Sequence, residues 1–361
     1  LVTGVQTCAL PISLRGWNES FDPTYTTERR RKMKKVGSII AVMMVIFMLM
    51  GCTSAAEEPA AESAAPAAEA EMTFENLNVG YAQIGAESEW RTANTASIKE
   101  EGERLGVNLK FSDAQQKQEN QISAIRSYIA EDVDVIGFSP VVETGWETVL
   151  QEAKDADIPV IMVDRRADVP RELYATYLGS DFVEEGKKAG NEMNNLLPDG
   201  GKLVELVGTV GSAPANDRYS GFRETLNDNI EIIDSQSGDF TRAKGKEVME
   251  AFLKNYGEEI TALYAHNDDM AIGAIQAIEE YGLKPGEDIK IVSIDAVRGA
   301  FEAMIDGKLN VTVECNPLLG PQFYDLALRA VNGEELPEWV PSEESVYYPD
   351  NAEELLPERQ Y

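Results

Sequence analysis

From Leu77 to the C-terminus, short runs of β-branched and other apolar residues alternate with longer segments whose apolar positions recur at helical spacing. Five apolar runs come first, and we expect each of them to form a strand: residues 76–83, 107–111, 133–138, 158–163 and 174–178. Amphipathic segments that begin near Glu89, Lys117 and Thr144 separate the first four runs and are predicted to be helices.

The same pattern then starts again. Five further apolar runs are predicted to be strands, at residues 202–208, 230–234, 260–265, 289–294 and 309–315, with helices that begin near Asn216, Arg242, Asp268 and Arg298. Strands that alternate with helices are typical of parallel sheets with right-handed crossover connections. The two sets therefore predict an α/β fold of two doubly wound parallel-sheet lobes.

Length and charge agree with two lobes and restrict the partners. The chain has 361 residues, 43% of them hydrophobic and 26% charged, which is enough to bury a sizeable core and favours two domains over one. Lys and Arg number 32 against 63 Asp and Glu, so the formal charge is -31 at pH 7. A phosphate backbone would repel such a chain, and we expect no nucleic-acid partner.

A basic cluster at residues 29–35 precedes an apolar run at 36–50, and Cys52 follows it. This order is typical of a secretory signal that starts at Met33. The run is shorter than the roughly 20 apolar residues that a bilayer-spanning helix needs, which favours a cleaved signal over an uncleaved anchor. The letters LMGC resemble the lipobox of bacterial lipoproteins, which implies lipidation of Cys52. Both interpretations place the rest of the chain outside the cytoplasm, at the membrane.

These features divide the first 76 residues into three parts. Residues 1–32 resemble the translated read of a sequencing adapter and are expected to be a non-native leader, and residues 33–51 are the expected signal peptide. Residues 52–76 are rich in Ala, Glu and Pro without apolar periodicity, which predicts a solvated tether after the lipidated cysteine. Of the three cysteines, Cys315 alone then remains in the folded part, which excludes an internal disulfide and a cysteine zinc site.

In an open parallel sheet, ligands bind beside the carboxyl ends of the strands, where the strand-to-helix loops converge. Five predicted loops of this kind carry polar or charged residues: IGAESEWRT, DRR, GTVGSAPANDR, AHNDD and DAVRG. None of them has the spacing of a phosphate-binding loop, and the sequence lacks the motifs of the common hydrolases and zinc peptidases. We therefore expect a binding protein without enzymatic activity, cofactor or metal.

Three of these loops carry an aromatic ring or paired charges. The indole of Trp90 suits the apolar face of a sugar, with Arg91 beside it for hydroxyl groups, although Trp90 could equally pack against its own helix. Asp164 and Arg165 end a buried strand and could bind neighbouring hydroxyls, with a structural salt bridge as an equal alternative. Arg218, taken alone, is more typical of a solvated side chain in the first turn of a helix.

The last two loops have a capping alternative. Asp295 could cap the segment that follows it, and at least one of Asn267, Asp268 and Asp269 is expected to be an N-cap. His266 is the only histidine and has no second histidine or cysteine nearby, so a hydrogen-bonded strand end is favoured over a metal ligand. The amide of Asn267 can donate and accept at once, which suits a hydroxyl-rich ligand better.

Several longer stretches resemble the sugar-binding proteins of bacterial ABC importers, in the ribose and galactose branch of the type 1 periplasmic binding protein family. They include GYAQIGAESEWRTAN, SDAQQKQENQISAIRSYIA, VDVIGFSPVVETGWE, IPVIMVDR, GTVGSAPANDRYSGF and YAHNDDMAIGAIQAI. The resemblance extends from about Leu77 to the C-terminus. The runs QQKQENQI, SQSGDFTR and AHNDDM are specific to the subgroup that binds galactofuranose. The resemblance therefore implies this sugar first, with ribose or another pentose or hexose as the alternative.

The ligand contacts of the family can be carried over to the positions of this chain that match its motifs. They fall on Glu87, Ser88, Glu89, Trp90, Arg91, Asp164, Arg165, Arg218, Asn267 and Asp295. The resemblance thereby favours a binding role for Trp90, Asp164 and Arg218 over the structural alternatives. Glu89 departs from a glycine of similar proteins and is expected to add a carboxylate beside the pocket. Cys315 stands where the ribose branch has a ligand-contacting glutamine.

The resemblance also implies a mechanism, in which the ligand engages both lobes and hinge closure presents the closed form to a membrane permease. It implies an N-terminal lobe of residues 77–180 plus 316–340 and a C-terminal lobe of 181–315 plus 341–361. The three crossings between the lobes are expected near Ser180, Asn316 and Val340.

The protein expected from these features is a monomeric, lipid-anchored, extracytoplasmic component of sugar uptake. The main alternative is a sugar-sensing subunit, whose closed form would be recognised by a chemotaxis receptor or a sensor kinase instead of a permease. A sugar-responsive repressor shares the fold but needs an N-terminal helix-turn-helix, where this sequence has a signal and a tether.

Overall fold

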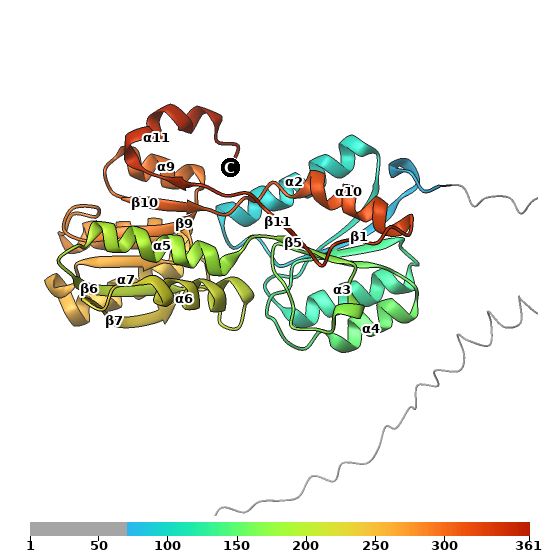
Figure 1. Ribbon diagram of the computed structural model, residues 1–361, viewed down its shortest axis with the longest axis horizontal. Helices are drawn as coiled ribbons and strands as arrows, with labels where there is room; N and C mark the ends of the chain where they lie inside the picture. Colours follow the sequence, from blue (N-terminus) through green and yellow to red (C-terminus); the bar gives the residue numbers. More distant parts are fainter. Residues whose placement is uncertain (1–70) are drawn as a thin grey trace, which may run out of the picture. The chain divides into compact units, whose positions relative to one another are not determined.

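The computed structural model describes residues 71–361, which form two six-stranded sheets with helices on their faces (Figure 1). The strands of the first sheet stand in the order β11-β5-β4-β3-β1-β2, and every pair is parallel. Their bounds are Asn78–Gln83 for β1, Asn108–Asp113 for β2, Val135–Phe138 for β3, Val160–Val163 for β4, Thr176–Gly179 for β5 and Trp339–Pro341 for β11.

The second sheet has the order β12-β10-β9-β8-β6-β7. Its bounds are Gly201–Val207 for β6, Ile230–Ser237 for β7, Ala262–Ala265 for β8, Lys290–Asp295 for β9, Val311–Glu314 for β10 and Val346–Tyr347 for β12. β12 pairs antiparallel with β10, and the other pairs are parallel. Each sheet and its helices form what we call the first lobe and the second lobe.

Helices connect successive strands in both lobes. In the first lobe they are α2 (Glu89–Leu105), α3 (Gln118–Ala130), α4 (Glu147–Asp155) and α10 (Gly320–Val331). In the second lobe they are α5 (Phe182–Leu196), α6 (Ala213–Thr225), α7 (Arg242–Tyr256), α8 (Asp268–Tyr281), α9 (Arg298–Ile305) and α11 (Pro349–Leu355). Short 3₁₀ turns lie at Phe74–Asn76, Arg171–Leu173, Gly257–Glu259 and Leu356–Glu358.

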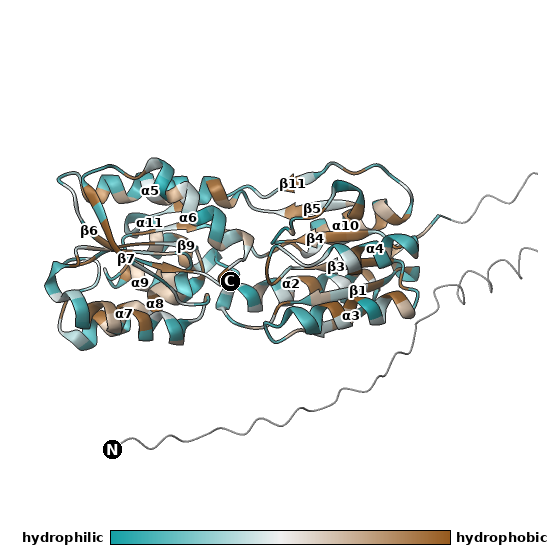
Figure 2. Cartoon of the chain, turned by 90° about the horizontal axis from the view of Figure 1, so that it is seen from below, coloured by the Kyte–Doolittle hydropathy of each residue, from teal (hydrophilic) through white to brown (hydrophobic). Residues whose placement is uncertain are grey.

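The inner strands β1, β3, β4 and β5 of the first sheet are buried on both faces. Their successive residues point to opposite sides, and helices cover both sides. Val135 and Ile161 pack in one apolar cluster with side chains of α2 and α10. Ile136 and Met162 pack in another, with side chains of α3 and α4. Figure 2 shows the result as hydrophobic strands lying inside helices whose outer faces are hydrophilic. The predicted doubly wound α/β fold is confirmed.

The chain passes between the two sheets three times. It leaves the first sheet after β5, which ends at Gly179, and returns to it after β10, which ends at Glu314. It leaves again after β11, so residues 342–345 form the third crossing, slightly beyond the Val340 that the sequence indicated. These three segments follow β5, β10 and β11, which lie at or next to the edges of the two sheets (Figure 1).

The expected leader, signal peptide and lipidated Cys52 lie outside the described residues, as does the tether up to residue 70. The folded part begins before the Leu77 that the sequence indicated. The backbone of Met72 exchanges hydrogen bonds with the side chain of Asn332, at 2.9 and 3.2 Å, and a 3₁₀ turn follows at Phe74–Asn76. Within residues 71–361, every helix is too short or too polar to span a bilayer.

Candidate functional site

The loops at the carboxyl ends of the strands meet around a cavity that holds about 290 Å³ of space. This volume includes space that is open to solvent, so the enclosed part of the cavity is small. The lining residues are Glu87, Ser88, Trp90, Arg91, Asp164, Arg165, Pro214, Arg218, Phe240, Asn267, Asp295 and Cys315. Every residue that the sequence nominated for sugar binding is among them except Glu89.

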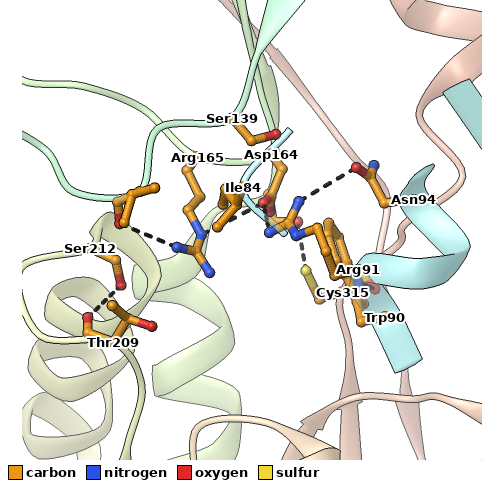
Figure 3. Close-up of polar contacts among 12 residues, drawn as sticks. Ile84, Trp90, Arg91, Asn94, Ser139, Asp164, Arg165, Thr209, Ser212 and Cys315 are labelled. Atoms are coloured by element: carbon orange, nitrogen blue, oxygen red, sulfur yellow. Dashed lines mark hydrogen bonds and ion pairs between the residues drawn. The ribbon is translucent and has the colours of Figure 1, made fainter. Parts of the chain in front are cut away.

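Arg91 links the charged groups on the first-lobe side of the cavity. Its guanidinium lies 2.5 Å from the carboxylate of Asp164 and 3.1 Å from that of Glu87. It also donates to the side chains of Gln83 and Asn94, at 3.3 and 3.4 Å. Figure 3 shows Arg91 beside Asp164 and Asn94. Asp164 has a positive φ of 66°, a conformation that Asp tolerates better than most residues, and this turns the end of β4 into the site.

Arg165 is buried with few partners. One of its nitrogens donates to the carbonyl of Val141 at 3.3 Å, and another lies 3.9 Å from Glu87. Its Nε and the Oε2 of Glu87 are both buried and have no hydrogen-bond partner within residues 71–361. Burial and the nearby charge of Arg91 lower the pKa of Arg165 to about 10, so the side chain remains charged at neutral pH. Here the cavity wall offers one unused donor and one unused acceptor.

Two aromatic rings complete the walls of the cavity. The indole of Trp90 packs in the apolar cluster of the second lobe and donates to the carbonyl of Cys315 at 2.6 Å. Figure 3 shows this contact beside Arg91, whose guanidinium lies 4.6 Å from the centre of the indole ring. The ring of Phe240 lies 5.2 Å from the guanidinium of Arg165. Trp90 therefore both lines the cavity and packs against the apolar cluster of the second lobe, so a binding role and a packing role do not exclude each other.

Arg218 holds the second-lobe side of the cavity together. It donates to Glu185 and to the carbonyl of His266, both at 2.6 Å, and lies 3.5 Å from Asp295. Against the effect of burial, the charge of Glu185 raises the pKa of Arg218 well above its ordinary value. Burial raises the pKa of Asp295 well above its ordinary value, although Arg218 opposes this. Arg218 is thus a buried, paired residue and not a solvated one.

Asn267 is the N-cap of α8, as expected for one residue of that loop. Its side-chain oxygen accepts from the backbone of Met270 at 3.0 Å, and its NH₂ group donates to the carbonyl of Phe240 at 3.1 Å. His266 points away from the cavity, and its Nε2 lies 3.1 Å from Glu205. Burial lowers the pKa of His266, and hydrogen bonds lower the pKa of Glu205 to about 2 in spite of its burial.

Glu89 is not in the lining of the cavity but lies at its rim, between the lining residues Ser88 and Trp90. Its backbone N–H donates to Asp269 at 2.7 Å, and its carboxylate lies 3.5 Å from Arg242. Both partners belong to the second lobe, so Glu89 forms a contact between the lobes at the rim. The reason is its place at the start of α2, where the side chain points out of the helix toward α7 and α8.

A second contact between the lobes lies elsewhere on the rim. The backbone N–H of Glu143 donates to the carbonyl of Gly211 at 2.9 Å, and its carboxylate accepts from Asn216 at 2.6 Å. The guanidinium of Arg166 pairs with the carboxylate of Asp217. Together with the Glu89 contact, these groups form what we call the rim contacts.

Three lining residues were not nominated from the sequence. Pro214 opens helix α6, and Cys315 was noted only as a missing family contact. Phe240 belongs to the SQSGDFTR run, in the loop between β7 and α7. Asp239 and Phe240 both have positive φ, at 52° and 59°, and this turn directs the loop into the site. The aromatic residue in a loop after a predicted strand was a usable signal for Phe240.

Two doubly wound lobes with a small cavity between them, lined by aromatic and charged groups, define a two-lobed solute-binding protein. The family model of the periplasmic binding protein domain matches residues 79–335. The chain belongs to the periplasmic binding protein family.

Relatives within the family are similar over nearly their whole length. The galactofuranose-binding protein YtfQ of Escherichia coli is 50% identical over 290 residues, which cover 78% of this chain and 90% of that protein. A Mycobacterium smegmatis structure in complex with β-D-fucofuranose is 52% identical with a TM-score of 0.77, covering 79% of this chain and 95% of that one.

A third relative is the binding protein of the arabinose ABC transporter from Shewanella sp. ANA-3, bound to α- and β-L-arabinofuranose. It is 46% identical with a TM-score of 0.76, covering 78% of this chain and 95% of that one. These relatives are binding proteins and not enzymes, in agreement with the prediction made from the sequence.

Proposed function

We propose that this protein binds a monosaccharide in its furanose form, with galactofuranose as the first candidate, and hands it unchanged to an ABC permease. The observation that carries the proposal is the composition of the cavity. Aromatic rings, guanidinium groups and carboxylates line it together, and buried Glu87 Oε2 and Arg165 Nε have no partner in the described chain. Such unpaired buried groups are costly unless a ligand satisfies them.

Each kind of side chain has a separate task in this proposal. Arg165 donates to hydroxyl oxygens, and Glu87 and Asp164 accept from hydroxyl hydrogens. The rings of Trp90 and Phe240 cover the apolar C–H faces of the sugar. The small volume of the site favours a single sugar ring over an oligosaccharide.

The furanose form is favoured by the names of three relatives. The Escherichia coli protein is named for galactofuranose, and the two structures hold fucofuranose and arabinofuranose. These sugars differ in their exocyclic carbons but share the five-membered ring. We infer that the groups lining the cavity recognise the five-membered ring. Contacts with the exocyclic carbons would then decide among the furanoses.

Calorimetry against galactose, fucose, arabinose and ribose tests the proposal, combined with carbon NMR of the bound sugar labelled at C1. We expect binding of galactose, with the bound signal at the chemical shift of the furanose form. A bound pyranose signal would contradict the furanose assignment. No heat with any of the sugars, or recovery of a changed sugar, would contradict the function itself.

Delivery to a permease requires that ligand binding changes the relation of the lobes. We propose that residues 77–180 plus 316–340 and residues 181–315 plus 341–361 move as two bodies about the three crossings, and that the protein acts as a monomer. A sugar that contacts both lobes favours the closed form by its differential affinity for that form. Small-angle scattering with and without galactose measures this, and an unchanged radius of gyration at saturation would contradict it.

We further propose that Cys52 carries the lipid that keeps the protein at the outer face of the membrane. Dual acylation holds a protein firmly where a single chain is marginal. Cys52→Ala should release soluble protein from cells, whereas the matched control Cys315→Ser should remain in the membrane fraction. Retention of the Cys52→Ala protein in the membrane fraction would contradict the anchor.

A further inference from the structure

The three segments that cross between the lobes meet at one polar cluster. The hydroxyl of Ser180, in the first crossing, donates to the Oε1 of Glu344, in the third. The same hydroxyl lies 3.4 Å from the sulfur of Cys315, in the second crossing, and the backbone N–H of Asn316 donates to the same Oε1 at 3.4 Å. Glu344 therefore connects all three crossings.

A second carboxyl group faces this cluster from α5. The side chain of Glu185 is fully buried, and one carboxylate oxygen accepts from Arg218. Its other oxygen, Oε1, has no hydrogen-bond partner within residues 71–361. Ligand atoms of Glu185, Cys315 and Glu344 all lie within 4.8 Å of one another. The carboxyl group with the unpaired oxygen thus lies next to a second carboxyl group.

The charges at this cluster do not balance if both carboxyl groups are ionised. Arg218 is the cation in contact with Glu185, but it also lies 3.5 Å from Asp295. Two carboxylates this close in a buried site repel each other strongly, and one of them normally keeps its proton. Lys188 approaches Glu344 as well, but its ammonium donates to the backbone carbonyl and not to the carboxylate.

We propose that Glu185 and Glu344 share one proton, and that this protonated pair is a fixed part of the hinge. The proton forms a hydrogen bond between the carboxyl group of Glu344 and the unpaired Oε1 of Glu185. Glu185 is then held from two sides, by Glu344 and by Arg218. Because Arg218 lines the cavity, the pair also positions a binding residue, so Glu185 and Glu344 act as positioning residues for the proposed sugar site.

The electrostatics of the cluster support this proposal. Burial and the charge of Glu185 raise the pKa of Glu344 to about 9, and burial raises the pKa of Glu185. The other titratable groups that face the pair are Tyr177, Lys188, Arg218, Asp295 and Cys315. Burial raises the pKa of the Cys315 thiol well above its ordinary value, so the thiol adds no charge at neutral pH.

A metal ion is the other way to compensate two carboxylates and a thiol. The geometry favours the proton, because Glu344 Oε1 already accepts two hydrogen bonds and Glu185 Oε2 is occupied by Arg218. A cation between these groups would have to compete with the guanidinium and with both donors. Glu185 Oε1 and Glu344 Oε2 are left without a hydrogen bond in the described chain, so one can carry the proton and the other can accept it.

Unfolding as a function of pH, without sugar, tests the shared proton independently of the proposed ligand. Because the folded pKa of Glu344 is raised above its unfolded value, the contribution of the pair to stability should be complete below about pH 4.5 and should be lost as the pH rises toward 9. One retained proton makes the unfolding constant rise about tenfold per pH unit in this window. Glu344→Gln, whose amide can still donate to Glu185, should reduce the slope by the equivalent of one proton.

Glu343→Gln is the matched control, because it removes the same charge from the exposed neighbouring residue. It should keep the slope of the unchanged protein. An equal slope in the Glu344→Gln protein and the unchanged protein would overturn the proposal. So would a rise in melting temperature on addition of Zn²⁺ that Glu344→Gln abolishes, because a metal would then occupy the place of the proton. Failure of sugar binding would leave this result unaffected.

Discussion

The two sides of the cavity are built from the same residue types but differ in how far their polar groups are already paired. On the first-lobe side, Arg165 and Glu87 each keep a buried atom without a hydrogen-bond partner within residues 71–361. On the second-lobe side, Arg218 is held by Glu185 and by a backbone carbonyl, and Asn267 caps α8. One side has capacity left for a ligand, and the other is braced by its own lobe.

This difference indicates that the two lobes would contribute to binding in different ways. Groups with unused hydrogen-bonding capacity gain most from a ligand, because burial without a partner is what costs free energy. Groups that are braced in advance lose little side-chain freedom on binding and fix the orientation of the ligand. We expect substitutions on the first-lobe side to cost more affinity than those on the second-lobe side.

The largest effect is expected at Arg165. Arg165→Ala removes a buried charged donor from the wall of the cavity, so sugar affinity should fall by about 2–5 kcal/mol. Calorimetry with galactose measures the loss, and Arg171→Ala is the control because Arg171 is exposed and outside the cavity. An affinity loss below tenfold for Arg165→Ala would contradict the expectation that substitutions on the first-lobe side cost more affinity than those on the second-lobe side.

An intermediate effect is expected at Asn267, where binding and capping can be separated. Asn267→Ser keeps an N-cap oxygen but loses the amide donor, so affinity should fall by about 1–3 kcal/mol with little change in melting temperature. Asn267→Ala should lose the cap as well and destabilise the fold by a further 0.5–2 kcal/mol, roughly. If Asn267→Ser bound sugar normally, Asn267 would be a capping residue alone.

The smallest effect on affinity is expected at His266, which lies behind the second-lobe side. His266→Gln should change the dissociation constant by less than about tenfold, or 1.4 kcal/mol. Its effect should instead be seen in the pH dependence of unfolding. Because burial lowers the pKa of His266, its contribution to stability should be lost as the pH falls below about 6.5, where the unfolded histidine takes up a proton. Thermal unfolding at pH 5 and pH 7 should therefore show the unchanged protein losing stability at pH 5 relative to His266→Gln.

The sequence predicted the strands well because each is a compact apolar run, and β4 and β8 match their runs closely. Helix α5 was not predicted, although its buried residues Phe182, Ala189 and Met193 have helical spacing. Its close packing is not visible in such a pattern. Gly186 and Gly190 face α6 so closely that a Cβ on Gly186 would lie 2.5 Å from the carbonyl oxygen of Arg218. Helix α10 was also missed, although Phe323, Leu326 and Ala327 have helical spacing.

The candidate site was predictable as a set of loops but not as a set of contacts. The rule that ligands bind at strand ends selects the loops of Arg91, Asp164 and Asn267 without reference to any relative. It does not indicate where a side chain points, and it therefore could not show that Glu89 lies at the rim of the cavity and not in its lining. Nor does it indicate that one residue serves two purposes, as Asn267 does by capping α8 and lining the cavity.

The rim contacts have a consequence for the evolution of such a protein. Glu143 and Arg166 engage Asn216 and Asp217 without touching the space that the sugar would occupy. In the proposed closure, their strength would set how readily the empty protein closes, and a shift in that equilibrium would multiply the affinity for every ligand by the same factor. Substitutions at the rim could therefore adjust the sugar concentration at which uptake begins while leaving the preference among sugars as it is. The residues that would set the sensitivity to sugar concentration therefore differ from those that would set the selectivity among sugars.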